Sequence, residues 1–182
     1  ETRKELRQFL TRLQITAVYV THDRIEALAL SDIIAVMQRG RILETGPPDK
    51  IYFHAEHRFV ADFIGRANLV DARVTGQTPH HTLVDSAIGP MVCQKRDLAP
   101  GAAATLCIRP EFIRPAAADD DGLNLKEAVV ESLVFIGEAF EGELRIGDQR
   151  LIAKIDPGSQ VAEGGRARVR MALEHCLLLP AD

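Results

Sequence analysis

The hydrophobic pattern of this 182-residue chain changes at about residue 67. Before that point apolar residues recur with helical spacing, as Leu6, Phe9 and Leu13 do at i, i+3 and i+7. Beyond it, short alternating runs are separated by Gly, Pro or Asp every ~8–12 residues, which is typical of a small β barrel or sandwich. The change predicts two domains: residues 1–66 with mixed helices and strands, and residues 67–182 with strands.

The second domain contains an internal repeat. Residues 101–111 can be laid over residues 164–174, with glycine, alanine, two apolar positions and a final glutamate in common. Such a repeat indicates two similar β units that share a core. Residues 166–171 alternate strictly, as a half-buried strand does, and Gly147-Asp148 is typical of a two-residue hairpin turn. The acidic run at residues 119–122 is interpreted as a solvated linker.

Within the first domain the sequence predicts helices alternating with strands. The expected elements are a helix around residues 6–13, a strand over 17–21, a helix over 23–30, a hairpin of strands 33–37 and 41–45, a short helix that begins at Pro48, and a helix over 56–64. Asp23 is placed to cap the second helix. Pro47, before Pro48, has no side-chain group that can cap the short helix, a cap worth ~1 kcal/mol whose absence Asp49 or water could compensate.

Composition excludes several function classes. Hydrophobic residues at 46% and charged residues at 26% are ordinary for a globular protein. The net charge of −4, the interspersed charges and the absence of Trp offer no nucleic-acid-binding surface. Cys93, Cys107 and Cys176 lack a Cys-x-x-Cys pair and indicate buried thiols in a reducing compartment. No apolar run approaches the ~20 residues of a membrane span, so we expect a cytoplasmic protein.

His22 is the main candidate for chemistry. It stands between the predicted strand at residues 17–21 and the helix that follows, so the strand would deliver the imidazole to the lip of a sheet beside a ligand. A neutral imidazole accepts a proton or hydrogen bond on one nitrogen and donates from the other. In that place it could reach a phosphate oxygen or an attacking water.

Three stretches resemble the ATPase subunits of ATP-binding-cassette (ABC) transporters. Thr21-His22-Asp23, followed by residues 26–32 (EALALSD), an apolar strand and residues 39–42 (RGRI), resembles their switch-histidine segment, the H-loop. Residues 46–52 (GPPDKIY) and 59–65 (FVADFIG) resemble the end of the nucleotide-binding domain in importers with a C-terminal accessory domain. The chain therefore looks like an α/β remnant of an ABC nucleotide-binding domain followed by an all-β, OB-type (TOBE or MOP-like) barrel.

The resemblance implies a catalytic role for His22, contacting the γ-phosphate of ATP and holding the water and the catalytic glutamate in register. For the intact protein it implies ATP and Mg²⁺ as cofactors. The implied partners are a second ATPase subunit, membrane permease subunits and, indirectly, a periplasmic binding protein, at the inner face of the plasma membrane. Arg24 and Ile25 depart from the Gln and Glu of many relatives, which puts the contacts of those positions in doubt.

The phosphate-binding loop, glutamine loop, signature motif and Mg²⁺-binding strand of such ATPases are absent from this sequence. Without them phosphoryl transfer loses most of its electrostatic stabilisation, so we expect these residues alone neither to bind nor to hydrolyse ATP. The strand expected at residues 17–21 would also expose apolar faces and an unpaired edge. We therefore expect the fragment to dimerise, to exchange elements or to have a disordered N-terminal part.

The sequence also bears on the transported solute and on one alternative function. Residues 59–65 with Ala67-Asn68-Leu69 most resemble the ferric-iron, polyamine and phosphonate importers. The alternative function is a stand-alone regulatory module for an oxyanion or small ligand, to which Ser86 and Thr105 would offer polar side chains.

Other polar residues suggest structure more than binding. Arg109-Pro110-Glu111 resembles a recurring TOBE motif and is interpreted as a strand-end turn in preference to a ligand contact. The pairs His54 and His57, and His80 and His81, lack a carboxylate or cysteine at ligand spacing, so no metal site is predicted.

Overall fold

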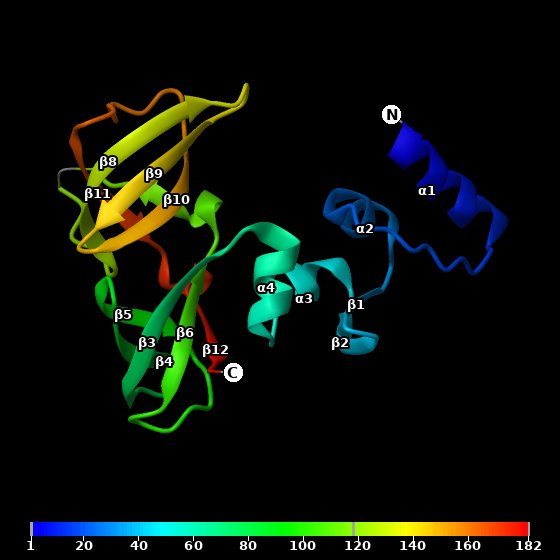
Figure 1. The fold of residues 1–182 in the computed structure, drawn as a ribbon, viewed down its shortest axis with the longest axis horizontal. Helices are drawn as coiled ribbons and strands as arrows, with labels where there is room; N and C mark the ends of the chain where they lie inside the picture. Colours follow the sequence, from blue (N-terminus) through cyan, green and yellow to red (C-terminus); the bar gives the residue numbers. More distant parts are fainter. Residues whose placement is uncertain (1, 118, 182) are drawn as a thin grey trace. The chain divides into compact units, whose positions relative to one another are not determined.

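The computed structural model describes residues 2–117 and 119–181. By its internal contacts the chain divides into two compact units, Glu1–Gly65 and Arg66–Asp182, next to the boundary expected from the change in pattern. Figure 1 shows helices in the first unit and strands throughout the second. In the described part of the chain, none of the helices is long and apolar enough for a membrane span.

The described residues of the first unit form helices and an antiparallel hairpin. Its elements are α1 (Thr2–Leu13), α2 (Arg24–Leu30), β1 (Ile34–Gln38), β2 (Arg41–Gly46), α3 (Pro48–Phe53) and α4 (Arg58–Gly65). The hairpin turns at Arg39 and Gly40, both with positive φ, as predicted. Pro48 opens α3 and Pro47 provides no side-chain cap. Asp49 Oδ1 accepts a hydrogen bond from the Lys50 amide at 2.9 Å, which compensates part of that loss.

The predicted strand at residues 17–21 is wrong. Residues 15–21 lie outside regular structure and pair with no strand among the described residues. Val18 and Val20 are each 92% exposed. A run of β-branched residues becomes a strand when a neighbour satisfies its backbone hydrogen bonds, and the described residues supply no such neighbour here. The α/β sheet expected of the first unit is therefore not seen.

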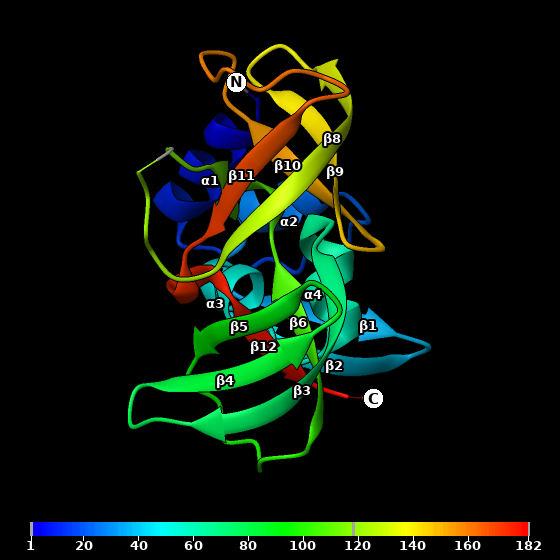
Figure 2. The same cartoon turned by 90° about the vertical axis from the view of Figure 1, so that its left-hand side faces the viewer.

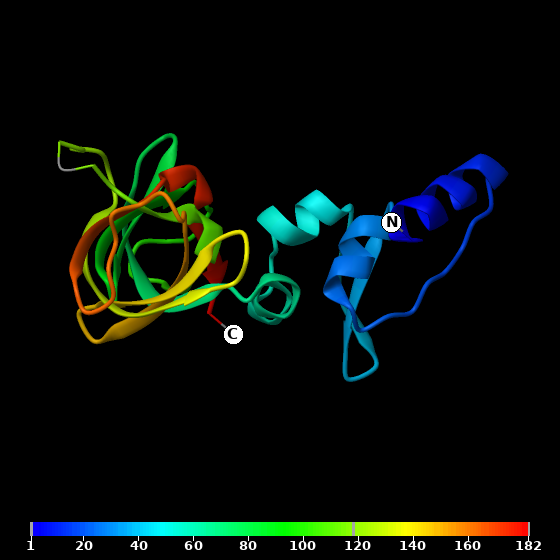
Figure 3. The ribbon, with the colours of Figure 1, turned by 90° about the horizontal axis from the view of Figure 1, so that it is seen from above.

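The second unit is built of two sheets, whose strands curl around a common interior in Figure 3. Its elements are β3 (Asn68–Gln77), β4 (His81–Ser86), β5 (Gly89–Gln94), β6 (Ala103–Ile108), η1 (Pro110–Phe112), β7 (Ile113–Pro115), β8 (Leu125–Phe135), β9 (Phe140–Ile146), β10 (Gln149–Ile155), β11 (Arg166–Met171), η2 (Leu173–His175) and β12 (Leu177–Pro180), where η marks a 3₁₀ turn. The hairpin at Gly147-Asp148 and the strand over Arg166–Met171 are as predicted.

The two sheets, whose labelled strands can be followed in Figure 2, have the same construction. Their strand orders are β5-β4-β3-β6-β12 and β10-β9-β8-β11-β7. Strands β3 to β7 form one half of the unit and β8 to β12 the other, so each half sends its last strand into the sheet of the other half. Because of this exchange, neither half completes its own sheet.

The hydrogen bonds of the two halves confirm the internal repeat. Gly101 has φ 86° and Gly164 has φ 77°, which suits a residue without Cβ. The two glycine amides donate to the Val74 and Val130 carbonyls, each at 2.8 Å. The equivalent rings of Phe112 and His175 stack at 3.5 Å with 8° between their planes. Equivalent residues can meet in this way at a local two-fold axis, which therefore passes close to the two rings.

One apolar core serves both halves. Its members come from both sheets and include Val70, Leu106, Val130 and Leu144, all at most 1% exposed. Cys93 lies in this core, and its burial raises the pKa of its thiol to about 12. A thiol in such surroundings is unreactive, in keeping with a packing role.

Two buried asparagines join the halves. Asn68, at the start of β3, donates from Nδ2 to the Ile152 carbonyl at 2.8 Å and accepts at Oδ1 from the Ile152 amide at 2.7 Å. Asn124, at the equivalent place before β8, bonds in the same way to the Val92 carbonyl at 2.7 Å and amide at 2.8 Å. Each asparagine thus satisfies the backbone of a strand in the opposite half, and both are 8% exposed.

We predict that Asn68→Ala and Asn124→Ala each lower the free energy of unfolding by roughly 1–3 kcal/mol, because each leaves a backbone amide and carbonyl without their partner. Urea denaturation followed by circular dichroism measures the change. Gln160→Ala, an exposed amide, is the matched control and should change stability by less than about 0.5 kcal/mol. Asparagine variants as stable as the control would show that the two bridges do not stabilise the unit.

Candidate functional site

His22 lies in the bend that precedes α2, and its side chain is exposed. The sequence predicted that a parallel strand would position His22, but the residue does not follow a strand. Instead, short hydrogen bonds on both sides of the residue hold its backbone. The site is therefore built from local interactions of the helix N-terminus.

Those interactions form a small network. Asp23 Oδ1 accepts hydrogen bonds from the Ile25 amide at 2.8 Å and the Glu26 amide at 3.2 Å, so Asp23 caps α2 as predicted. Thr21 Oγ1 accepts from the Asp23 amide and donates to Glu26 Oε2, both at 2.9 Å. Because Thr21 and Asp23 are both fixed to the first turn of the helix, the Cα of His22 between them is positioned while its imidazole is left to face solvent.

The Arg109-Pro110-Glu111 motif forms the turn that ends β6. Pro110 opens η1, and the Arg109 carbonyl accepts a hydrogen bond from the Phe112 amide at 3.0 Å. Arg109 is 5% exposed, so most of its side chain is inside the unit. This geometry agrees with the interpretation of the motif as a strand-end turn, while Glu111 also lines a pocket.

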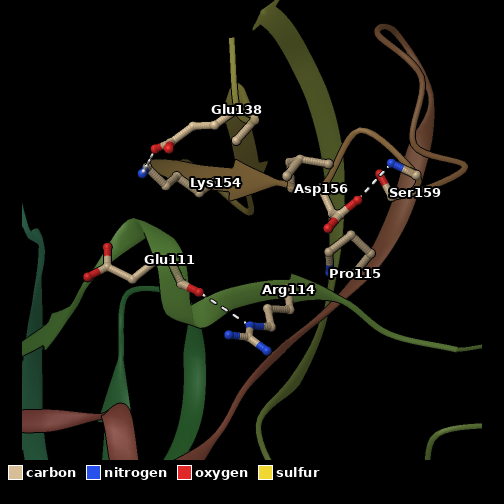
Figure 4. A pocket seen from close by; sticks show the side chains of 10 residues that line it. Glu111, Arg114, Pro115, Glu138, Lys154, Asp156 and Ser159 are labelled. Atoms are coloured by element: carbon tan, nitrogen blue, oxygen red, sulfur yellow. Dashed lines mark hydrogen bonds and ion pairs between the residues drawn. The ribbon is translucent and has the colours of Figure 1, made fainter. Parts of the chain in front are cut away.

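That pocket lies in the second unit and has a volume of about 610 Å³. Figure 4 shows charged side chains around it, from η1, β7, the β8–β9 turn and the end of β10. Its polar lining consists of Glu111, Arg114, Glu138, Lys154, Asp156 and Ser159. The sequence did not single out Arg114, Lys154 or Asp156, because they come together through the strand exchange.

The pocket contains charges of both signs. Lys154 Nζ on β10 pairs with Glu138 Oε1 in the β8–β9 turn at 3.0 Å. Arg114 Nε donates to the Glu111 carbonyl at 3.4 Å, which leaves the two Nη groups of the guanidinium available. Asp156 Oδ1 accepts from the Gly158 amide at 2.7 Å and orders the loop after β10.

The remaining polar candidates have structural partners. His57 Nδ1 lies 3.5 Å from Glu44 Oε2, and the His80 and His81 rings lie 6.3 Å apart. Within residues 2–117 and 119–181, no group of three His, Cys, Asp or Glu residues is arranged to hold a metal ion. Ser86 Oγ donates to the Gly89 carbonyl at 2.7 Å within a hairpin. Ser86 and Thr105 lie on β4 and β6, two strands of one sheet that are separated by β3.

The TOBE domain family matches residues 106–179. Among solved structures, the cytoplasmic molybdate-binding protein ModG, with molybdate bound, has a TM-score of 0.55 and is 11% identical, covering 61% of this chain and 94% of that protein. At this identity the likeness concerns the fold. Residues 106–179 of the second unit therefore match a TOBE domain, and the unit shares the fold of this molybdate-binding protein.

Curated proteins with similar sequences indicate the class of protein that this chain resembles. A spermidine/putrescine import ATP-binding protein of Pseudomonas aeruginosa is 40% identical over 86% of this chain and 46% of its own length. An sn-glycerol-3-phosphate import ATP-binding protein of Chromohalobacter salexigens is 32% identical over 100% of this chain and 49% of its own. An Fe(3+) ions import ATP-binding protein of Agrobacterium fabrum is 41% identical over 66% and 34%. The chain spans about half the length of the curated relatives it matches. These matches confirm the resemblance to the TOBE-containing part of ABC importer ATP-binding subunits.

We predict that Asp23→Ala destabilises the first unit by about 1 kcal/mol, since the Ile25 and Glu26 amides lose their cap. A fluorophore on α2, followed during urea titration, reports the local change. Asp32→Ala removes a carboxylate whose pair with Arg7 is exposed, at 3.4 Å, and should have a smaller effect. Equal effects of the two substitutions would contradict the capping role.

Proposed function

We propose that this chain is the C-terminal part of the ATP-hydrolysing subunit of a bacterial ABC importer. In the intact protein, ATP binding and hydrolysis would be coupled to uptake of a solute. The observation that carries the proposal is similarity across both units to import ATP-binding proteins, over 100% of this chain in one relative. Such similarity over two unlike units is more specific than a match to the β domain alone.

The catalytic residue we assign in this chain is His22. Its imidazole is exposed and its backbone is held by the capped helix, which suits a side chain that must reach a ligand from a fixed point. When bound in the intact subunit, ATP with Mg²⁺ supplies the phosphoryl group. His22 would donate a hydrogen bond to a γ-phosphate oxygen or accept one from water. The residues that hold the nucleotide's charge would come from outside this sequence.

The partners follow from the same proposal. Two ATP-binding subunits would form a dimer, contact membrane permease subunits at the cytoplasmic face, and respond indirectly to a periplasmic binding protein. We propose a solute of the ferric-iron, polyamine or phosphonate class. The names of the spermidine/putrescine and Fe(3+) importers among the relatives support the first two of these.

A stand-alone oxyanion-binding or small-ligand-binding regulatory module is the alternative. Its support is the fold shared with a molybdate-binding protein at 11% identity, and a fold by itself does not specify a function. The importer proposal explains both units, whereas the alternative explains the second. We therefore prefer the importer.

These 182 residues by themselves should bind ATP more weakly than millimolar, because the sequence lacks the phosphate-binding loop and its lysine. Isothermal calorimetry with Mg²⁺-ATP measures this directly. An affinity of millimolar or better would contradict the assignment of nucleotide binding to residues outside the chain.

In the intact subunit, His22→Ala should lower the rate of ATP hydrolysis by about 10²–10³-fold, the loss typical for one preorganised polar group at a transition state. ATP binding should change far less, which separates a catalytic role from misfolding. His54→Ala, also an exposed histidine of the first unit, is the matched control and should hydrolyse ATP normally. A His22→Ala subunit with unchanged turnover would refute the assignment.

A further inference from the structure

The charged pocket of the second unit is lined by residues of both halves, and its two cations have neutral residues at the equivalent places of the repeat. Strand register identifies the equivalent residues. Arg114 on β7 is opposite Arg170 on β11, as Leu177 on β12 is opposite Cys107 on β6. Arg114 therefore takes the place that Leu177 takes in the other half. Leu177 is 8% exposed, whereas the Arg114 side chain is exposed.

Lys154, the second cation of the pocket, also differs in charge from its equivalent residue. Lys154 is opposite Glu141 in the β9–β10 pair, as Gln94 is opposite His81 in the β4–β5 pair. The Gln94 side chain donates to the Glu174 carbonyl in the η2 turn. Lys154 instead pairs with Glu138 over the pocket. Both cations thus replace neutral residues, of which Leu177 is buried and Gln94 is hydrogen-bonded to the η2 turn.

The balance of charge defines what such a pocket can accept. Among the described residues no carboxylate pairs with Arg114, so its Nη groups can take a ligand carboxylate. The Lys154–Glu138 pair is exposed, with side chains 43% and 77% accessible, so a ligand can open it at low cost. Asp156 adds a third carboxylate to those of Glu111 and Glu138 in the pocket lining (Figure 4).

We propose that this pocket binds a small zwitterion, a molecule with a carboxylate and an ammonium group separated by a few carbons. Arg114 and Lys154 would hold the carboxylate, and Glu138 and Asp156 the ammonium. A dication would place one of its ammonium groups against Arg114 and Lys154, and a dianion would place one of its carboxylates against Glu138 and Asp156, so each would lose one of the two favourable contacts. The volume of about 610 Å³ is within the range of small-molecule sites. The proposal is independent of the transport function.

The test compares three four-carbon probes that differ in end-group charge: 4-aminobutyrate, putrescine and succinate. Each is titrated into the ¹⁵N-labelled 182-residue chain while amide chemical shifts are followed. We expect 4-aminobutyrate to shift the Gly158 and Ser159 amides saturably with a millimolar Kd. Putrescine and succinate should bind at least 10-fold more weakly. Putrescine binding as tightly as 4-aminobutyrate would make the pocket a cation site, and no saturable shift with 4-aminobutyrate would overturn the proposal.

The contribution of each basic residue to binding is tested by replacing it with the residue at the equivalent place of the repeat. Arg114→Leu and Lys154→Gln introduce the residues found at the equivalent places, and each should weaken 4-aminobutyrate binding at least 10-fold. Arg166→Leu, which removes an exposed arginine of β11 outside the pocket lining, should leave binding unchanged. The amide spectrum of each variant shows whether it is folded. Folded Arg114→Leu protein that binds normally would refute the role of Arg114.

Discussion

The structure of the β domain depends on the exchange of hydrogen bonds between its halves, for which Asn68 and Asn124 are the clearest instances. Each buried amide pairs with both backbone groups of one residue in the opposite half, Ile152 or Val92. A backbone amide or carbonyl that is buried without a partner is costly, so these bonds hold β10 and β5 where they are. Together with the exchanged strands β7 and β12, they make the two halves one folding unit with a common core.

Much of this domain could be predicted because its turns have strong local signals. The backbone has a positive φ at Gly101 and Gly164, a conformation that favours glycine. The residues after each glycine are similar in sequence because they form equivalent strands. The two buried asparagines also belong to a sequence repeat, which lies outside the repeat that begins at Gly101. Asn68-Leu69 and Asn124-Leu125 are each followed, after one intervening residue, by an acidic residue and Ala-x-Val, so extending the comparison to the first strand of each half would have revealed them.

Features that depend on distant partners could not be predicted in the same way. Residues 17–21 have every local property of a strand, yet strand formation requires a neighbour, and none is present among the described residues. The pocket poses the converse problem. Arg114 and Lys154 carry no common motif, and it is the passage of β7 into the other sheet that places them around one cavity. In contrast, the Asp23 cap beside His22 could be predicted, because its partners in the sequence are also its neighbours in space.

Comparison of equivalent residues in the two halves distinguishes positions that the fold requires from positions that serve binding. Positions that fold the domain keep their chemistry in both halves, as Asn68 and Asn124 do. Positions at the pocket differ, with Arg114 in place of Leu177 and the fold unchanged around them. A leucine at this place is compatible with the fold, so the fold does not require an arginine there. An exposed guanidinium that lines the same pocket as a second cation does not improve packing, and its presence is better explained by recognition of an anionic group than by stability.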